Sequence, residues 1–205
     1  MAVTLTTPNT LLGTFVPKSD ATRLVSTIAT VVLGTLFITL CSKINVPTWP
    51  VPVTLQTFGV ATLAAAFGWR VGAATLALYI LEGLSGLPVF AGAAAGPTYL
   101  FGPTGGFIIG FLLMAIIVGK AADMGLSRRP LALFGAMLLG DAVVLVVGFA
   151  WLLALAGNAS WIDHSNVVGS AFAKAVQPFI VWDALKMAFA ALTVSGIWAL
   201  LRRKA

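Results

Sequence analysis

One apolar segment near the C-terminus constrains the fold of this chain more than any other. Pro178–Leu201 is long enough to cross a bilayer, which takes about 20 apolar residues, and three basic residues follow it at once. Asp183 and Lys186 stand inside it, three residues apart and therefore on one face of a helix. Each charge alone would cost ~2.5–3.5 kcal/mol on membrane-insertion scales. The pair is either a structural ion pair between helices or the polar floor of a ligand site, and we favour the ligand site.

The rest of the chain has the same character. Of its 205 residues, 60% are hydrophobic and 9% are charged, and the mean hydropathy is +1.03. This composition indicates an integral membrane protein, and continuous rather than alternating apolar runs favour an all-α one. A single cysteine and a single histidine exclude an internal disulfide and a multi-histidine metal site, so we expect neither a metal nor a cofactor.

Six apolar runs predict six transmembrane helices in one membrane domain, residues 23–205, after an N-terminal cytoplasmic arm, residues 1–22. The second and third runs are short. The expected spans are Leu24–Ile44, Val53–Phe67, Val71–Leu84, Phe107–Lys120, Leu131–Leu155 and Pro178–Leu201.

The basic residues predict the orientation. With six spans, Lys43 and Lys174 lie on one side, and nine lysines and arginines lie on the other: Lys18, Arg23, Arg70, Lys120, Arg128, Arg129, Arg202, Arg203 and Lys204. Cytoplasmic loops carry the excess of basic residues, so both termini are expected in the cytoplasm. The net charge of +6 therefore reflects topology, and nucleic acid is not an expected partner.

The segment between the third and fourth spans is unusual. Residues 83–106 combine many glycines and prolines with apolar and aromatic residues, and they fall on the outer side. Irregular apolar backbone at membrane depth is tolerated only when it is buried in protein or lines a cavity. We therefore expect an outer lid loop, residues 84–104, over a pocket. Gln56, which enters the second span from the same side, either hydrogen-bonds in that pocket or only begins its helix.

Three further features have less specific interpretations. Ser26, Thr30 and Gly34 form a small-residue stripe on the first span, which is a candidate docking face for a partner subunit. Asp141 lies in the fifth span, deeper than Asp183, and we expect a structural role for it. An intramembrane aspartyl protease would need two complete aspartate motifs in the opposite order, so a membrane-embedded enzyme that uses both aspartates is a minor hypothesis.

Four motifs carry a resemblance to a known family: Val51-Pro-Val-Thr-Leu-Gln-Thr57, Gly86-Leu-Pro-Val-Phe-Ala-Gly92, Gly102-Pro-Thr-Gly-Gly106 and Asp183-Ala-Leu-Lys186. In this order, over about residues 23–203, the chain resembles the BioY family, the biotin-specific substrate-binding (S) components of energy-coupling factor (ECF) transporters. The resemblance implies a six-helix S-component fold, capture of biotin from outside the cell membrane, and no catalysis. It also implies two kinds of partner, a transmembrane T component and two cytoplasmic ABC-type ATPases.

The resemblance further implies that Asp183 and Lys186 contact biotin and that the loop from Gly86 to Gly102, including Gly92, closes over it. The ureido ring offers two N–H donors and one acceptor to the pair. Phe90 and Tyr99 are expected as apolar walls, and Lys186 serves either the ureido oxygen or the valeryl carboxylate. Val181-Trp182 stands where the family pattern has Pro-Gly, so the height of Asp183 is not fixed. A binding subunit for another vitamin on the same fold, and a stand-alone channel or secondary carrier, are also compatible with the sequence.

Overall fold

The computed structural model describes residues 9–11, 13 and 20–204, and most of this part of the chain is helical. Six longer helices alternate with short elements. The longer ones are α2 (Asp20–Lys43), α3 (Gln56–Phe67), α4 (Trp69–Leu84), α6 (Gly105–Asp123), α7 (Pro130–Ala154) and α9 (Ile180–Lys204). The short ones are strands β1 (Asn45–Val46) and β2 (Val53–Thr54), helices α5 (Pro97–Leu100) and α8 (Val167–Ala175), and 3-10 turns η1 (Leu126–Arg128) and η2 (Ala156–Asn158).

Each of the six expected spans coincides with one of the longer helices, and four of them have the length and composition to cross a membrane. These four lie within Thr22–Lys43, Gly105–Asp123, Pro130–Ala154 and Val167–Leu201, a range that includes α8 and α9. At 1.5 Å per residue, α3 with 12 residues spans roughly 18 Å and α4 with 16 residues roughly 24 Å, less than a hydrocarbon core of about 30 Å. Membrane crossing by these two helices stays a prediction.

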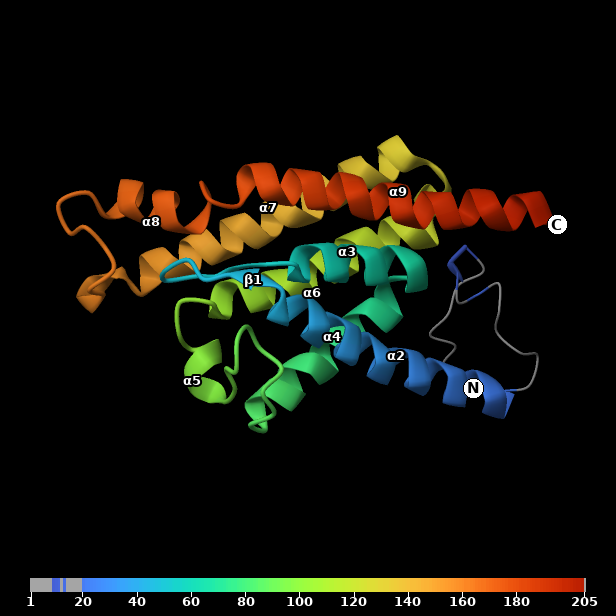
Figure 1. Cartoon of the computed structure of the whole chain (residues 1–205), viewed down its shortest axis with the longest axis horizontal. Coiled ribbons are helices and arrows are strands. Elements are labelled where there is room, and N and C mark those ends of the chain that lie inside the picture. The colour runs from blue at the N-terminus through green and yellow to red at the C-terminus, as the bar shows by residue number, and fades with distance from the viewer. Residues whose placement is uncertain (1–8, 12, 14–19, 205) are drawn as a thin grey trace.

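Helix α6 lies at the centre of the bundle. It packs along α7 and against α3 and α4, while α9 closes the far side against α3 and α7, and α2 packs against α3 and α4 (Figure 1). Gly110 lets α6 approach α7 closely, because a Cβ there would lie 2.8 Å from the Cα of Val144. The core between these helices is apolar and includes fully buried Met114, Met137 and Met187.

Different structural elements lie at the two ends of the bundle. The start of α2 and the end of α9 lie at one end, on the right of Figure 1. The β1–β2 hairpin, α5 and α8 lie at the other end, where the irregular segments gather. The predicted arm, residues 1–22, lies largely outside the described residues, and α2 already begins at Asp20 within it.

The structure corrects two local predictions. The second span does not begin at Val53, because Val53–Thr54 pairs antiparallel with Asn45–Val46 and the helix starts only at Gln56. The polarity of residues 158–177, between the fifth and sixth spans, predicts a loop, but this segment contains helix α8. Asn166 caps that helix, since its side chain accepts a hydrogen bond of 3.1 Å from the backbone N–H of Gly169.

Candidate functional site

The acid–base pair of α9 forms an ion pair inside the bundle. Lys186 Nζ lies 2.6 Å from Asp183 Oδ1, and the side chains of Lys186 and Asp183 are 14% and 1% exposed. Phe179, Met187 and Ala190 are buried on the same face of the segment, as its helical spacing predicts. Because α9 begins at Ile180, Asp183 lies in the first helical turn, closer to the helix start than a helix from Pro178 implies. A carboxylate in the first turn also interacts favourably with the helix dipole.

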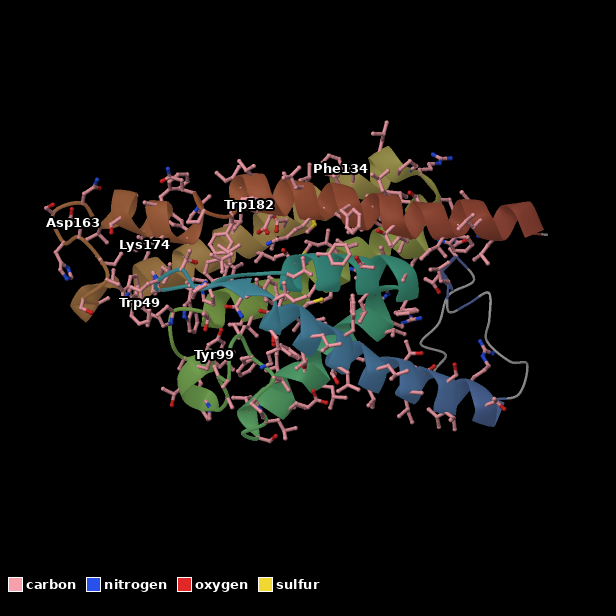
Figure 2. The ribbon with its side chains drawn as sticks, in the orientation of Figure 1. Trp49, Tyr99, Phe134, Asp163, Lys174 and Trp182 are labelled. Atoms are coloured by element: carbon pink, nitrogen blue, oxygen red, sulfur yellow. The ribbon has the colours of Figure 1, made fainter. Side chains whose placement is uncertain are left out.

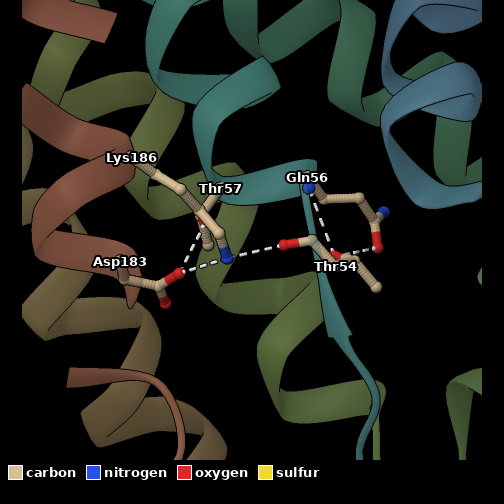
Figure 3. Close-up of polar contacts among 5 residues, drawn as sticks. All are labelled: Thr54, Gln56, Thr57, Asp183 and Lys186. Carbon is tan, nitrogen blue, oxygen red and sulfur yellow. Dashed lines mark hydrogen bonds and ion pairs between the residues drawn. The ribbon is translucent and has the colours of Figure 1, made fainter. Parts of the chain in front are cut away.

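The junction of β2 and α3 supplies the other side of the pair (Figure 3). The Thr57 hydroxyl donates to Asp183 Oδ1 at 3.0 Å, and Lys186 Nζ donates to the backbone carbonyl of Thr54 at 2.7 Å. That carbonyl is available because the chain leaves the strand at Thr54 and enters the helix at Gln56. The junction of β2 and α3 therefore holds the pair in place, although it lies more than 120 positions before the pair in the sequence.

The pair keeps hydrogen-bonding capacity on both partners. Asp183 Oδ2 is buried and meets no N–H or hydroxyl donor among the residues that the structure describes, although the carboxyl group of Asp141 lies within hydrogen-bonding reach of the Asp183 side chain. An ammonium has three N–H donors, and Lys186 directs two of them to Asp183 and Thr54. A buried acceptor without a donor costs free energy, so this site is suited to a ligand that brings N–H groups to Asp183.

Three spaces lie around the pair, and one of them is a cleft of about 470 Å³ that borders Lys186, Thr54 and Trp182. A cavity of about 30 Å³ borders Asp183, Lys186, Gln56 and Thr57, and its apolar wall comes from Phe107, Ile108, Phe111, Val144 and Phe179. A larger cleft of about 500 Å³ lies between the hairpin loop and the outer loop. Pro52, Tyr99 and Thr104 border both the inner cavity and this outer cleft and therefore separate the polar floor from the outer cleft. Figure 2 shows Tyr99 on α5 and Trp49 in the hairpin loop at this end of the molecule.

Gln56 borders the inner cavity, and its contact with a ligand there stays a prediction. Its side chain is buried, and Nε2 donates to the Tyr79 hydroxyl at 2.9 Å. Its Oε1 accepts from the Thr54 hydroxyl at 3.1 Å. Gln56 therefore has fixed protein partners on both sides of its amide.

The aromatic residues of the outer loop take different positions. Tyr99 borders both the inner cavity and the outer cleft, whereas Phe90 borders neither of them, and its role as a wall of the ligand site stays a prediction. The Phe90 ring stacks on Tyr99 with a centroid distance of 4.9 Å and meets Tyr79 edge-on at 5.5 Å. Gly83 makes room for it, because a Cβ there would lie 2.1 Å from Phe90 Cζ. Gly92 borders the outer cleft only.

Two further residues singled out in the sequence lie outside the cavity wall. Asp141 is buried in α7, close enough to Asp183 and Lys186 for electrostatic interaction, and its Oδ1 has no hydrogen-bond partner among the described residues. Gly34 faces the interior, where a Cβ would lie 2.8 Å from both Leu63 Cδ1 and Thr75 Cγ2, so this residue cannot be part of a docking face.

The rest of the docking stripe is partly accessible. Ser26 and Thr30 are half-buried, and the Thr30 hydroxyl donates to the Ser26 carbonyl at 2.8 Å. Their contact with a partner stays a prediction.

Sequence reasoning missed part of the floor. Thr57 stands in one of the quoted motifs, but nothing in its spacing relates it to Asp183, which lies 126 positions away. The Thr54 contribution is a backbone carbonyl, which any residue type would provide. The only available signal was a polar residue in the first turn of an otherwise apolar helix.

The chain is similar in sequence to a family of known proteins. The sequence model of the BioY family matches residues 13–203. The chain is 35% identical over 122 residues to biotin transporter BioY2 of Lactococcus lactis subsp. cremoris (strain MG1363), which covers 60% of this chain and 66% of that relative. It is 34% identical over 158 residues to biotin transporter BioY of Thermotoga maritima, which covers 77% of this chain and 87% of that one.

The fold has a counterpart among solved structures. The crystal structure of the S-component for biotin from an ECF-type ABC transporter matches with a TM-score of 0.74 and 23% sequence identity. The match covers 86% of this chain and 93% of that one. The bundle therefore has the S-component fold.

Proposed function

The chain belongs to the BioY family, and from this premise we propose that it is the biotin-binding membrane subunit of an ECF transporter, a carrier rather than an enzyme. The observation that supports this most is the Asp183–Lys186 pair, buried at the wall of a cavity with a carboxylate oxygen that meets no donor among the described residues. The ligand, in this proposal, supplies the missing partner.

Biotin can satisfy the hydrogen-bonding groups of the Asp183–Lys186 pair that have no protein partner. Its ureido group brings two N–H donors that point to opposite sides of the ring, and Asp183 Oδ2 accepts one of them. The third N–H of Lys186 meets an acceptor, either the ureido oxygen or the valeryl carboxylate. The thioether ring and the alkyl chain pack against apolar wall residues such as Phe107 and Phe179.

The sizes of the inner cavity and the outer cleft imply a movement on binding. A cavity of about 30 Å³ matches the share of liquid volume that one water molecule takes, ~30 Å³, which is far less than a vitamin needs. The outer cleft, about 500 Å³, lies in the range of ~300–1,000 Å³ that is typical of ligand pockets. Biotin therefore passes from the outer cleft into the inner cavity only when the partition of Pro52, Tyr99 and Thr104 moves, and in our proposal the outer loop closes again behind it.

The distribution of basic residues supports a proposal for how the chain is oriented in the membrane. In our proposal all six longer helices lie in the plasma membrane, α3 and α4 included, with the site near the outer face and both termini in the cytoplasm. The nine basic residues predicted on the cytoplasmic side support this orientation. A transmembrane T component and two cytoplasmic ABC-type ATPases would then drive release of biotin to the inside.

The primary test is calorimetric titration of biotin into the purified, detergent-solubilised chain after removal of any co-purifying ligand. We expect tight one-to-one binding that Lys186→Ala abolishes. Lys174→Ala serves as the matched control, because Lys174 lies on α8 and borders neither the inner cavity nor the outer cleft, and this variant should bind as the parent does. No heat of binding in a folded protein would contradict biotin as the ligand, and competition by other vitamins would then identify the substrate.

The contact of Lys186 can be assigned by a double-mutant cycle. Biotin and its methyl ester are titrated into the parent protein and into Lys186→Gln. If Lys186 binds the valeryl carboxylate, the losses from esterification and from substitution are not additive. If it binds the ureido oxygen, the two losses add.

A further inference from the structure

Lys43, the last residue of α2, makes an unusual set of contacts with the outer loop. Its ammonium donates to three backbone carbonyls, those of Pro88 at 2.5 Å, Phe90 at 2.6 Å and Gly92 at 2.7 Å. An ammonium has three N–H donors, so all of them are directed to this one loop. The side chain thus joins the end of a membrane helix to a segment 45–49 positions later in the chain.

Two buried hydroxyls bind the same segment from below. The Tyr79 hydroxyl donates to the Val89 carbonyl at 2.9 Å, and Ser42 Oγ lies 2.8 Å from the same oxygen and 2.7 Å from the Thr39 carbonyl, so its single proton is shared between these two acceptors. Residues 87–92 form neither helix nor strand, so their carbonyls lack the partners that regular structure provides. Side chains of α2 and α4 therefore determine where this part of the loop lies.

A continuous hydrogen-bond chain connects this anchor to the floor. Tyr79, which binds the Val89 carbonyl, also accepts from Gln56 Nε2 at 2.9 Å. Gln56 Oε1 accepts from the Thr54 hydroxyl, and the Thr54 carbonyl accepts from Lys186. The pair and the loop are thus connected through Thr54 and the side chains of Gln56 and Tyr79.

We propose that Lys43 and Tyr79 are positioning residues for ligand retention, which rests on the proposed function of the site. Lys43 holds residues 88–92 against α2, and this segment places Phe90 behind Tyr99, the residue that separates the floor from the outer cleft. Tyr79 couples the same segment to Gln56. Without the ammonium, Tyr99 loses its support and the bound ligand leaves faster.

The test uses Lys43→Met, which shortens the unbranched side chain by one atom and removes all three donors, with Lys174→Met as the matched control. Hydrogen–deuterium exchange of residues 87–96 is measured in the ligand-free protein, and the dissociation rate of labelled biotin is measured by chase. We expect faster exchange in this segment and dissociation faster by roughly tenfold, the factor that about 1.4 kcal/mol provides. Lys174→Met should change neither quantity.

Tyr79→Phe separates the coupling from the anchor. The substitution keeps the ring that packs against Phe90 and removes the hydroxyl, so Gln56 loses its partner while the Val89 carbonyl keeps Ser42. We expect biotin dissociation to be a few-fold faster, with a smaller change in loop exchange than Lys43→Met causes. Equal dissociation rates in Tyr79→Phe and the parent would overturn the role of Tyr79.

Two results for Lys43→Met would overturn the proposed role of Lys43 as the anchor of the loop. Unchanged exchange of residues 87–96 would show that the ammonium does not hold the loop. Faster exchange with unchanged dissociation would show that the anchor has no part in retention, which also overturns the proposal. If the parent protein binds no biotin, the proposed function fails, whereas the exchange measurement still decides whether Lys43 holds the loop.

Discussion

The floor of the site and the loop above it are held by different means. The floor lies where α3 and α9 begin, and most of its contacts join side chains to one another, as between Asp183, Lys186 and Thr57. The loop is irregular, and its carbonyls are held by the side chains of Lys43, Ser42 and Tyr79. The floor thus depends on residue identity at a few positions, whereas the loop depends on donors that reach a backbone of almost any sequence.

The difference suits a carrier that must bind tightly and also open. Side chains on packed helices keep their geometry, which recognition of a polar ligand requires. A segment without a backbone ladder loses little when it moves, since its few anchoring bonds can reform. Substitutions in the floor should therefore change biotin affinity by removing contacts with the ligand. Substitutions in the loop should change it indirectly, by altering how firmly the loop is held and how fast the ligand dissociates.

The largest effect is expected at Asp183. Asp183→Ala removes the acceptor for the ligand and leaves the partly buried ammonium of Lys186 without its counter-charge, which costs on the order of 3–5 kcal/mol of stability when one partner of a buried pair is lost. Asp183→Asn keeps an oxygen for the Thr57 hydroxyl and should fold better. Both should weaken biotin binding at least ~100-fold in a calorimetric titration. If folded Asp183→Asn bound biotin with the affinity of the parent protein, the Asp183–Lys186 pair would not be part of the binding site.

Gly83→Ala comes next and tests the loop. A Cβ at Gly83 would lie 2.1 Å from Phe90 Cζ, so the ring must move and carry Tyr99 with it. Such overpacking costs about 1–3 kcal/mol, and biotin affinity should fall by roughly ten- to a hundredfold. Gly135→Ala, in α7, is the matched control, because its Cβ meets nothing within 4 Å and alanine favours a helix by roughly 0.8–1 kcal/mol over glycine. Thermal unfolding and titration of both variants provide the comparison, and equal behaviour would contradict the close packing of Phe90.

The helices were predictable from the sequence because the bilayer imposes them. Long apolar runs must satisfy their backbone internally, so each run forms a helix within a few residues of its expected bounds. The hairpin was missed because strands of two residues are too short for any periodicity. Helix α8 was missed although Asn166 provides a capping signal, since polarity suggested a loop.

The candidate site was predictable only where it lies on one helix. Asp183 and Lys186 follow from a three-residue spacing, and the cavity places them together as expected. Thr57 meets Asp183 only through the packing of α3 on α9, which no local pattern encodes. The contacts of Lys43 are with carbonyls, which every residue carries, so the sequence could not indicate them.

Thr57→Val should have a smaller effect than Asp183→Asn or Gly83→Ala. It removes the donor to Asp183 Oδ1 and keeps the shape of the side chain, and one such hydrogen bond is worth about 1–2 kcal/mol. We expect biotin affinity to fall roughly five- to tenfold. Thr62→Val is the control in the same helix, because its hydroxyl is buried without a hydrogen-bond partner among the described residues and its loss should leave binding unchanged. Similar affinities for both variants would show that Thr57 does not support the floor.

The smallest effect is expected at Asp163, in the other outer segment. Figure 2 shows it beyond Lys174 at the far end of the bundle, away from the outer loop. The Ser165 hydroxyl and backbone N–H donate to its carboxylate and lower the pKa of Asp163 below its ordinary value. A lowered pKa means that this stabilisation is complete above an ordinary aspartate pKa of about 3.9 and is lost as the pH falls through the lower value. Asp163→Asn should therefore reduce thermal stability slightly at neutral pH, lose that difference in acid, and leave biotin affinity as in the parent. A change in biotin affinity would mean that the segment around Asp163 also belongs to the binding site, in addition to the floor and the outer loop.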